Sequence, residues 1–378
     1  MAHNETYIIA HHILTPLGNG IAANWQAISE SRSGVALQYR DGFRDQPVCA
    51  SLFSESQWAG MGDSLPAALT RFEQLLLSAL QGALGQVNID LSGSRTLLLL
   101  ASTKGNIGLL APGMPNPQDH VGLVQSARKI AGYLNYHSHP VVVSNACISG
   151  MTALLTAKRL MDAGHYDHAV VAGADCISPF IVAGFRSFQA LSDETCRPFD
   201  IDRKGINLGE GAAAIILSRT ASSIRLSAGS TSSDANHISG PSRTGEEMAQ
   251  AIMTALERAG LGCRDIGGIS AHGTATSFND EMESKAFMLS GLEHSPVFSL
   301  KAYFGHTLGA AGLLESAIAV EALQKGIIPA SKGYRKHGVS QPVTIAETTI
   351  LAPGMRHILK TGSGFGGCNA ALVFSKNN

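Results

Sequence analysis

Two stretches of the chain share one pattern, Pro140-Val-Val-Val-Ser144 and Pro296-Val-Phe-Ser-Leu300. Each apolar run has the length of a buried strand. A short loop follows each run, and then a helix-length segment rich in small residues, which ends at Gly164 in the first case and at Gly326 in the second. The pattern predicts two similar strand–loop–helix units whose loops meet at one central site. A chance similarity stays open at this point, because strand–loop–helix is the commonest unit of α/β proteins.

Apolar runs and helix-length segments alternate along most of the chain. We expect strands at residues 7–10, 96–102, 140–144, 168–174, 212–217, 297–300 and 370–374, and helices at residues 24–31, 67–85, 148–163, 245–259, 278–289 and 308–325. Buried strands between helices indicate an α/β fold with a largely parallel core sheet. Residues 228–244, rich in Ser, Thr, Gly and Pro, are expected to form a functional loop.

The composition describes a large body with little charge. The 378 residues include 28 basic and 29 acidic side chains, which gives a formal charge of −1. Charged residues make up 15% of the chain, against about 25% in an average soluble domain. A low charged fraction is typical of a compact body or of an oligomer. The balance excludes disorder, and nucleic-acid binding loses its main support because there is no basic excess.

Neither the hydropathy nor the cysteines point outside the cytoplasm. No apolar run reaches the ~20 residues that a membrane span requires, and the first residues show no signal peptide. The six cysteines have no Cys-x-x-Cys spacing; they are Cys49, Cys147, Cys176, Cys196, Cys263 and Cys368. We therefore expect a cytoplasmic protein with reduced thiols, without a disulfide framework or a zinc site.

Cys147 is the candidate nucleophile. In Val143-Ser-Asn-Ala-Cys-Ile-Ser-Gly150 a buried strand ends and a helix begins at or just after the cysteine. The free N–H groups and the partial positive charge of a helix N-terminus favour the thiolate, so we expect a lowered pKa. The same N–H groups suit a developing oxyanion. The alternative, a packed core cysteine, is the better interpretation of Cys49, Cys176, Cys196 and Cys263.

Two histidines stand in similar glycine-rich contexts. His272 lies in Ala271-His-Gly-Thr-Ala-Thr276, where the glycine permits a close backbone approach and two hydroxyls can bond an extended polar chain. His306 begins a helix whose first turns are small residues, in the stretch from Lys301 to Gly312. A cysteine and two imidazoles suit carbon–carbon bond formation on thioesters. The sulfur holds an acyl group, and the imidazoles donate hydrogen bonds to a second thioester carbonyl as its carbanion forms.

These residues resemble those of the β-ketoacyl-acyl-carrier-protein synthases, the elongating condensing enzymes of the thiolase superfamily, over nearly the whole chain. The family's motifs appear in order: Thr15-Pro-Leu-Gly18, Asn145-Ala-Cys147, Arg197-Pro-Phe-Asp200 with Gly209-Glu-Gly211, Ser233-Asp-Ala-Asn-His237, Ala271-His-Gly-Thr-Ala-Thr276, Lys301 with Gly305-His306 and Gly309-Ala-Ala-Gly312, and Gly364-Phe-Gly-Gly367. The resemblance implies a thiolase-like α/β fold. Two similar βαβαβαββ halves, residues 1–225 and 226–378, would form a five-layer α-β-α-β-α body.

The resemblance also implies an acyltransferase reaction, the decarboxylative Claisen condensation of an acyl thioester with malonyl-acyl-carrier-protein. Cys147 would take the acyl group, and His272 and His306 would bind the malonyl thioester carbonyl and promote decarboxylation. Lys301 would support His306 electrostatically, and Glu315 would belong to the same polar network.

Further roles concern substrate binding. The resemblance implies an oxyanion hole made by the backbone N–H groups of Cys147 and Phe365. Phe365, flanked by Gly364 and Gly366, would gate the acyl pocket, and Asp234 and His237 would belong to a second gating segment. Thr274 and Thr276 would bond the phosphopantetheine arm.

The implied partners are an acyl carrier protein and a second subunit, either a copy of the chain or a related ketosynthase or chain-length subunit. No metal and no cofactor of the chain's own are implied, since the carrier protein brings the phosphopantetheine. Lys332, Arg335 and Lys336 are a candidate basic patch for the carrier, although a solvated loop explains them as well. Asp280, Glu281 and Glu283 could be metal ligands, but their place early in a helix is explained more simply by the helix dipole.

The chain departs from the family at two places near the acyl pocket. Ser363 stands where an aromatic residue is usual, and residues 105–140 form a shorter stretch than in general fatty-acid synthases. We therefore expect a specialised enzyme of polyene or polyketide elongation. Two rival functions remain: a thiolase or initiating synthase, disfavoured by the two histidines, and a non-catalytic chain-length partner, disfavoured by Cys147.

Overall fold

Two groups of five strands form the centre of the molecule in the computed structural model, which describes residues 5–40, 43, 46–111 and 120–377. The first group stands in the order β6-β5-β7-β9-β1: β6 (Val141–Val143), β5 (Thr96–Ala101), β7 (His168–Asp175), β9 (Gly211–Ser218) and β1 (Tyr7–Thr15). The second stands in the order β12-β11-β15-β16-β10: β12 (Val297–Phe298), β11 (Gly268–Ser270), β15 (His357–Gly364), β16 (Cys368–Lys376) and β10 (Ile224–Ser233).

The two groups have one topology. Numbered along the chain within each group, both orders read 3-2-4-5-1, with parallel pairing among the first three strands and antiparallel pairing to the last two. They join where Tyr7 and Ile8 of β1 pair with β10. The two similar halves are thus confirmed, and the strands at residues 140 and 296 hold the same place in each. The expected boundary between residues 225 and 226 stays a prediction; β10 begins at Ile224.

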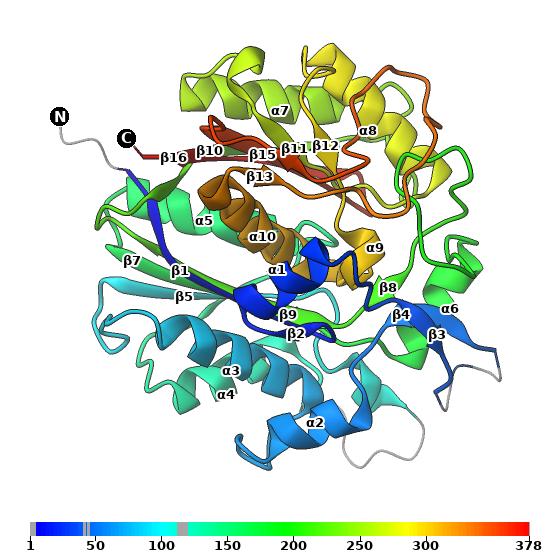
Figure 1. Ribbon diagram of the computed structural model, residues 1–378. Helices are drawn as coiled ribbons and strands as arrows, with labels where there is room; N and C mark the ends of the chain where they lie inside the picture. The colour runs from blue at the N-terminus through cyan, green and yellow to red at the C-terminus, as the bar shows by residue number, and fades with distance from the viewer. Residues whose placement is uncertain (1–4, 41–42, 44–45, 112–119, 378) are drawn as a thin grey trace.

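Helices form three layers around these strands (Figure 1). Helices α7 (Glu246–Ala259) and α8 (Ser277–Leu289) lie on the outer side of the second group, and α3 (Arg71–Leu84) and α4 (Leu123–Tyr133) on the outer side of the first. Between the two groups lie α5 (Ser149–Asp162) and α10 (Ala311–Lys325), each in contact with strands of both. The expected five-layer α-β-α-β-α body is confirmed.

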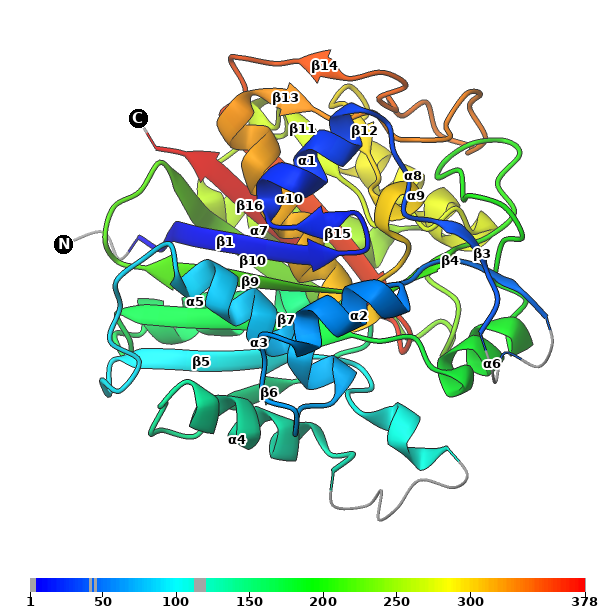
Figure 2. The same cartoon turned by 60° about the horizontal axis from the view of Figure 1, so that its bottom comes forward.

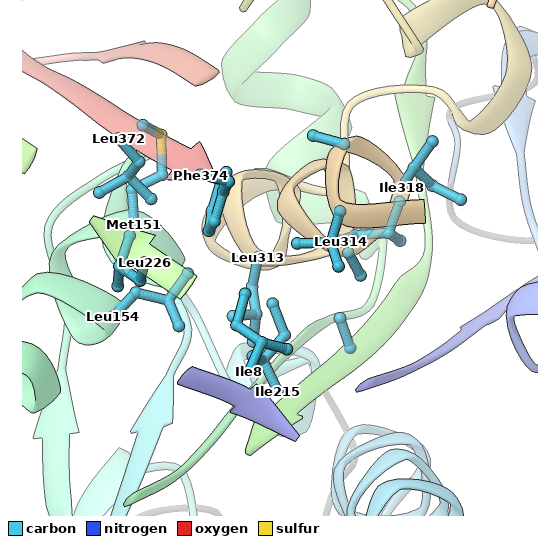
Figure 3. Packing of buried hydrophobic residues seen from close by; sticks show 14 of the residues in the cluster. Ile8, Met151, Leu154, Ile215, Leu226, Leu313, Leu314, Ile318, Leu372 and Phe374 are labelled. Carbon is cyan, nitrogen blue, oxygen red and sulfur yellow. The ribbon is translucent and has the colours of Figure 1, made fainter. Parts of the chain in front are cut away.

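Glycines let the two central helices cross closely. A Cβ atom on Gly150 of α5 would lie 2.7 Å from the backbone nitrogen of Leu313, and one on Gly312 of α10 would lie 2.6 Å from Cγ of Met151. The contact is reciprocal, because each glycine packs against the residue that follows the other glycine in the sequence. Figure 3 shows both helices among apolar side chains of both strand groups, Ile8, Ile215, Leu226, Leu372 and Phe374. The crossing brings the loops that precede α5 and α10 to the same region.

The remaining elements complete the surface. They are β2 (Gly18–Asn19), α1 (Ile21–Ser29), β3 (Ala36–Gln38), β4 (Val48–Ser51), α2 (Glu55–Gly62), η1 (Ile107–Leu110), α6 (Pro179–Ser187), β8 (Leu208–Gly209), η3 (Cys263–Asp265), α9 (Lys301–Phe304), η4 (Leu308–Ala310), β13 (Ile327–Ile328) and β14 (Ile350–Leu351). Strands β3, β4 and β8 form a small sheet that lies beside α6 (Figure 2). Within the described ranges, no helix has both the length and the apolar character needed to cross a bilayer.

Two expectations need adjustment. Residues 228–233 are not part of a loop, because they continue β10 and pair with β16; small Ser and Gly residues hide the strand pattern there. The loop is confined to residues 234–244. Of the stretch 105–140, residues 112–119 lie outside the described residues, as do the first four residues of the chain.

Candidate active site

Cys147 sits in a tight turn between β6 and α5. Ala146, the residue before it, has a φ of 43°, in the left-handed region that residues other than glycine rarely adopt. The Ser149 hydroxyl fixes the turn, since it accepts a hydrogen bond from the Asn145 backbone N–H at 2.8 Å and donates one to the Ala146 carbonyl at 2.6 Å. The turn places Cys147 in the wall of a cavity of about 530 Å³.

The surroundings of the Cys147 thiol keep it protonated. Burial raises the pKa of Cys147 to about 12, while the charge of Lys301 and a hydrogen bond from the Phe365 backbone N–H act to lower it. This reverses the lowered pKa expected from the helix terminus, because the cost of removing the thiolate from water outweighs the favourable contacts. The Phe365 N–H lies beside the sulfur, as an oxyanion hole requires.

The loop that bears His272 is held by two buried carboxylates of α8. Glu283 accepts hydrogen bonds from the backbone N–H groups of His272 and Gly273 at 2.8 and 2.7 Å, and Asp280 from those of Thr274 and Ala275 at 3.0 and 3.1 Å. Burial raises the pKa of Asp280 to about 7. Neither the helix dipole nor a metal explains these acids as well as this role, which the sequence analysis missed. The sequence signal for this role was the position of Asp280 and Glu283 shortly after the loop that bears His272.

His306 follows α9 and is held by β8. Gly305 has a φ of 66°; the His306 N–H donates to the Asn207 carbonyl at 2.7 Å, and the His306 carbonyl accepts from Gly209 at 3.0 Å. The rings of His272 and His306 meet edge to face with centroids 5.2 Å apart. Burial, and then the charge of Lys301, lowers the pKa of both imidazoles well below the ordinary value. Both rings are therefore neutral hydrogen-bond donors at neutral pH.

Lys301 and Glu315 lie behind the two histidines. The Lys301 ammonium is fully buried, donates to the His272 carbonyl at 2.9 Å and is paired with the Glu315 carboxylate. Its direct contact is with His272, whereas its influence on His306 is through charge. The other Glu315 oxygen lies 2.8 Å from Nζ of Lys360, a buried lysine of β15 that the sequence analysis did not single out. No local signal marks this lysine, because polar and small residues, Thr361 and Gly362, follow it in the strand.

The cavity brings together most of the expected site. Its wall includes Cys147, His237, His272, Thr274, Thr276, His306, Gly364 and Phe365. The hydroxyl oxygens of Thr274 and Thr276 lie 2.8 Å apart. The Phe365 ring contacts Phe185 and Phe188, with centroids 5.8 and 5.2 Å away, two aromatic residues that the sequence analysis did not name.

The two expected gating segments are bonded to each other. The Asp234 N–H donates to the Gly367 carbonyl, and the Gly366 N–H donates to the Ile238 carbonyl, both at 2.7 Å. The buried Asp234 carboxylate accepts bonds from the N–H groups of residues 236 and 242, so it stiffens its own loop. His237 lies in the cavity wall instead.

The sequence and the fold both match known families. The model described as "Beta-ketoacyl synthase, N-terminal domain" matches residues 4–223, and "Beta-ketoacyl synthase, C-terminal domain" matches residues 223–335. A Schizosaccharomyces pombe protein assigned as a mitochondrial 3-oxoacyl-[acyl-carrier-protein] synthase is 28% identical over 96% of this chain and 97% of its own. The tetracenomycin polyketide synthase ketoacyl synthase alpha subunit of Streptomyces glaucescens is 33% identical over 66% of this chain and 63% of its own.

A solved structure shares the whole fold. A chain of the ishigamide ketosynthase/chain length factor is 25% identical and has a TM-score of 0.86, with 99% of both chains covered. The family match spans more than half of the chain and includes the turn that bears Cys147. The chain therefore belongs to the β-ketoacyl synthase family, a family of condensing acyltransferases.

Proposed function

We propose that this protein condenses an acyl thioester with a malonyl thioester carried by an acyl carrier protein, with loss of CO2. The observation that supports this is the convergence of Cys147 from the first half with His272 and His306 from the second on one cavity. A nucleophile and two neutral donors are what the two half-reactions require.

In the first half-reaction, the Cys147 sulfur attacks the carbonyl of the acyl thioester. Either neutral imidazole of the pair can accept the thiol proton, and one of them must do so because burial keeps the thiol protonated. The N–H groups of Cys147 and Phe365 bind the oxyanion. The bond between the carbonyl carbon and the carrier sulfur then breaks, and the carrier thiolate takes the proton.

In the second half-reaction, His272 and His306 donate hydrogen bonds to the malonyl thioester carbonyl. The bond to the carboxylate breaks, CO2 leaves, and its electron pair forms an enolate that the two donors stabilise. The enolate carbon attacks the acyl carbonyl. The bond between that carbonyl carbon and the Cys147 sulfur then breaks, and the Cys147 thiolate takes up a proton from water.

The residues that line the cavity suit a carrier-bound substrate. Thr274 and Thr276 would bond the phosphopantetheine arm, and Phe365, between Gly364 and Gly366, would gate the acyl chain. The carrier is proposed because the S. pombe relative is named for it. Lys204 and Arg243 line the cavity and would meet an acidic carrier there. The arm comes with the substrate, so the reaction needs no cofactor of the chain's own.

The patch from Lys332 to Lys336 is less suited to the carrier. Lys332 donates to the Ser31 carbonyl, and the backbone N–H groups of Arg335 and Lys336 bind the Asp200 carboxylate. These hydrogen bonds hold the loop against the rest of the protein, which explains the residues without a carrier.

The acyl chain is proposed to be a polyene or polyketide chain. Ser363 lines the cavity and donates to Asn369 at 2.8 Å, so the wall is small and polar where an aromatic side chain is usual in the family. The tetracenomycin relative acts in polyketide synthesis. An assay with a panel of acyl carriers tests this, because preference for saturated medium or long chains over unsaturated or aryl primers would overturn it.

A second subunit is proposed, either a copy of this chain or a related ketosynthase or chain-length subunit. Strand β6 ends the strand order beside α4 (Figure 2), and its three valines are only partly buried. The ishigamide structure contains a ketosynthase/chain length factor. Size-exclusion chromatography of the chain alone separates the cases: a stable dimer supports a copy, and a monomer or an aggregate supports a missing partner.

We also propose that the halves are residues 1–225 and 226–378, and that the protein is cytoplasmic. The same strand order in each half supports the division. All six cysteines are free thiols, which suits a reducing compartment.

The decisive experiment for the reaction is intact mass spectrometry. Incubation with an acyl carrier should leave one acyl group on the peptide that contains Cys147. Addition of malonyl carrier should then release CO2 and a β-ketoacyl carrier. A chain that takes no acyl group from any carrier contradicts the proposal.

A further inference from the structure

Lys360 is a buried cation whose hydrogen-bond partners lie next to His272 in the chain. Its side chain is fully buried in β15, and its Nζ lies 2.8 Å from Oε2 of Glu315. It also donates to the carbonyls of Ser270 and Ala271, at 3.3 Å each, and to that of Thr361 at 2.5 Å. A buried ammonium is costly unless acceptors and an opposite charge surround it, and here it has three carbonyl acceptors and one paired carboxylate.

The acceptors of Lys360 continue those of Lys301. Lys301 binds the carbonyl of His272, and Lys360 binds those of the two residues before it. Two ammonium groups thus hold three successive carbonyls at the end of β11, and one carboxylate, that of Glu315, joins the two ammonium groups.

A second carboxylate holds the same segment from its N–H side. Glu283 binds the N–H groups of His272 and Gly273 and accepts the Thr361 hydroxyl at 2.8 Å. Lys360 and Thr361 are neighbours in β15, so this one strand holds the segment around His272 in two ways. Lys360 binds the carbonyls of Ser270 and Ala271. Thr361 bonds Glu283, which in turn binds the N–H groups of His272 and Gly273. The ring of His272 is left free to face the cavity.

We propose that Lys360 is a positioning residue for His272: with Lys301 and Glu315 it fixes the strand end from which the imidazole projects toward the malonyl carbonyl. The role rests on the proposed condensation, in which decarboxylation needs both imidazoles as donors, whereas His306 alone can accept the thiol proton when the acyl-enzyme bond forms. Loss of Lys360 should therefore separate the two half-reactions.

The test is Lys360→Met, with Lys325→Met as a control that removes an exposed lysine at the end of α10, outside the cavity wall. Malonyl decarboxylation should fall about ten- to hundredfold, as expected for the loss of hydrogen bonds to a charged group. Acylation of Cys147, followed by intact mass, should change less than about threefold. Unchanged decarboxylation, or equal loss in both half-reactions, would overturn the proposal.

A second readout does not depend on activity. In protein labelled with ¹³C-histidine, the imidazole signal of His272, assigned from a His272→Asn variant, should move in Lys360→Met and stay in place in Lys325→Met. An unmoved signal overturns the role of Lys360. If the wild type carries out neither half-reaction, the proposed function fails, and this signal still decides the role of Lys360.

A second variant guards against misfolding. Lys360→Gln removes the cation, leaves the buried Lys301–Glu315 pair intact and keeps a polar group at the end of the side chain. It should move the His272 signal as Lys360→Met does, because the shorter side chain no longer holds the carbonyls of Ser270 and Ala271. If both variants fail to fold while Lys325→Met folds, Lys360 is a folding residue and the positioning role is wrong.

Discussion

The turn from β6 to α5 and the segment from β12 to α10 hold the same place in the two halves, but they carry different residues. The first is a tight turn in which Ala146 takes a φ of 43° and Cys147 lines the cavity. The second contains two extra short helices: α9 supplies the buried Lys301, and the cavity residue His306 lies between α9 and η4. In the proposed reaction, one topology thus provides a nucleophile where the connection is short and an electrostatic site where it is long.

The outer edges of the halves differ as well. In β12, Val297 and Phe298 are fully buried, and Val297 pairs with Ile345 outside the strand order. The three valines of β6 are only partly buried, and β6 ends the strand order of the described residues, paired with β5 alone. A paired edge cannot accept another strand, whereas an unpaired one can, so the comparison favours the first half for the proposed subunit contact.

The largest expected effect separates the two connections. Cys147→Ala should reduce condensation by more than about 10³-fold because no other group can hold the acyl chain, yet malonyl decarboxylation should persist. His306→Ala should lose decarboxylation while Cys147 still takes an acyl group. Acyl-enzyme mass and CO2 release measure the two steps.

Cys147→Ala and His306→Ala must fold as well as the wild type for their activities to be compared. Both variants should keep the thermal midpoint of the wild type within a few degrees. Undiminished condensation by Cys147→Ala would falsify the assignment of the nucleophile.

The reciprocal glycines of the helix crossing should respond unequally. In Gly150→Ala the new methyl group meets the backbone nitrogen of Leu313 at 2.7 Å, which cannot move alone. In Gly312→Ala the nearest atom, at 2.6 Å, is in the flexible side chain of Met151. We expect a loss of about 3 kcal/mol in the first and about 1 kcal/mol in the second. Urea unfolding measures both, and a larger loss in Gly312→Ala contradicts the crossing.

The sequence predicts the parts of this structure that local pattern determines. Strand β5, Thr96–Ala101, is apolar throughout and buried throughout, and Cys147 and His306 both lie where a strand gives way to a helix. The role of Lys360 could not be predicted, because a lysine in a strand reads as exposed until Glu315 of α10 is known to face it. The raised pKa of Cys147 has a similar cause: the helix terminus is visible in the local sequence, but the burial that outweighs it depends on the whole fold around the cavity.

The Ser149 hydroxyl sharpens the contrast between the two connections. Ser149→Ala removes two hydrogen bonds from the Cys147 turn, each worth about 1 kcal/mol. Acylation of Cys147 should fall about tenfold, while decarboxylation, which depends on the other connection, should stay within about twofold. Quenched acylation assays on the wild type and Ser149→Ala measure the acylation rate, and CO2 release measures the decarboxylation rate. An equal fall in both rates would mean that the two connections are not independent.

The smallest expected effect is that of pH on acylation. An imidazole with the ordinary pKa of about 6.5 would be about 90% protonated at pH 5.5 and could not accept the thiol proton. Burial and the charge of Lys301 lower the pKa of His272 and His306, so the neutral form persists as the pH falls. The acylation rate should therefore change less than about twofold between pH 7 and pH 5.5. A tenfold fall with a midpoint near pH 6.5 would show that the imidazoles titrate as exposed histidines do, and that the second connection does not hold them neutral.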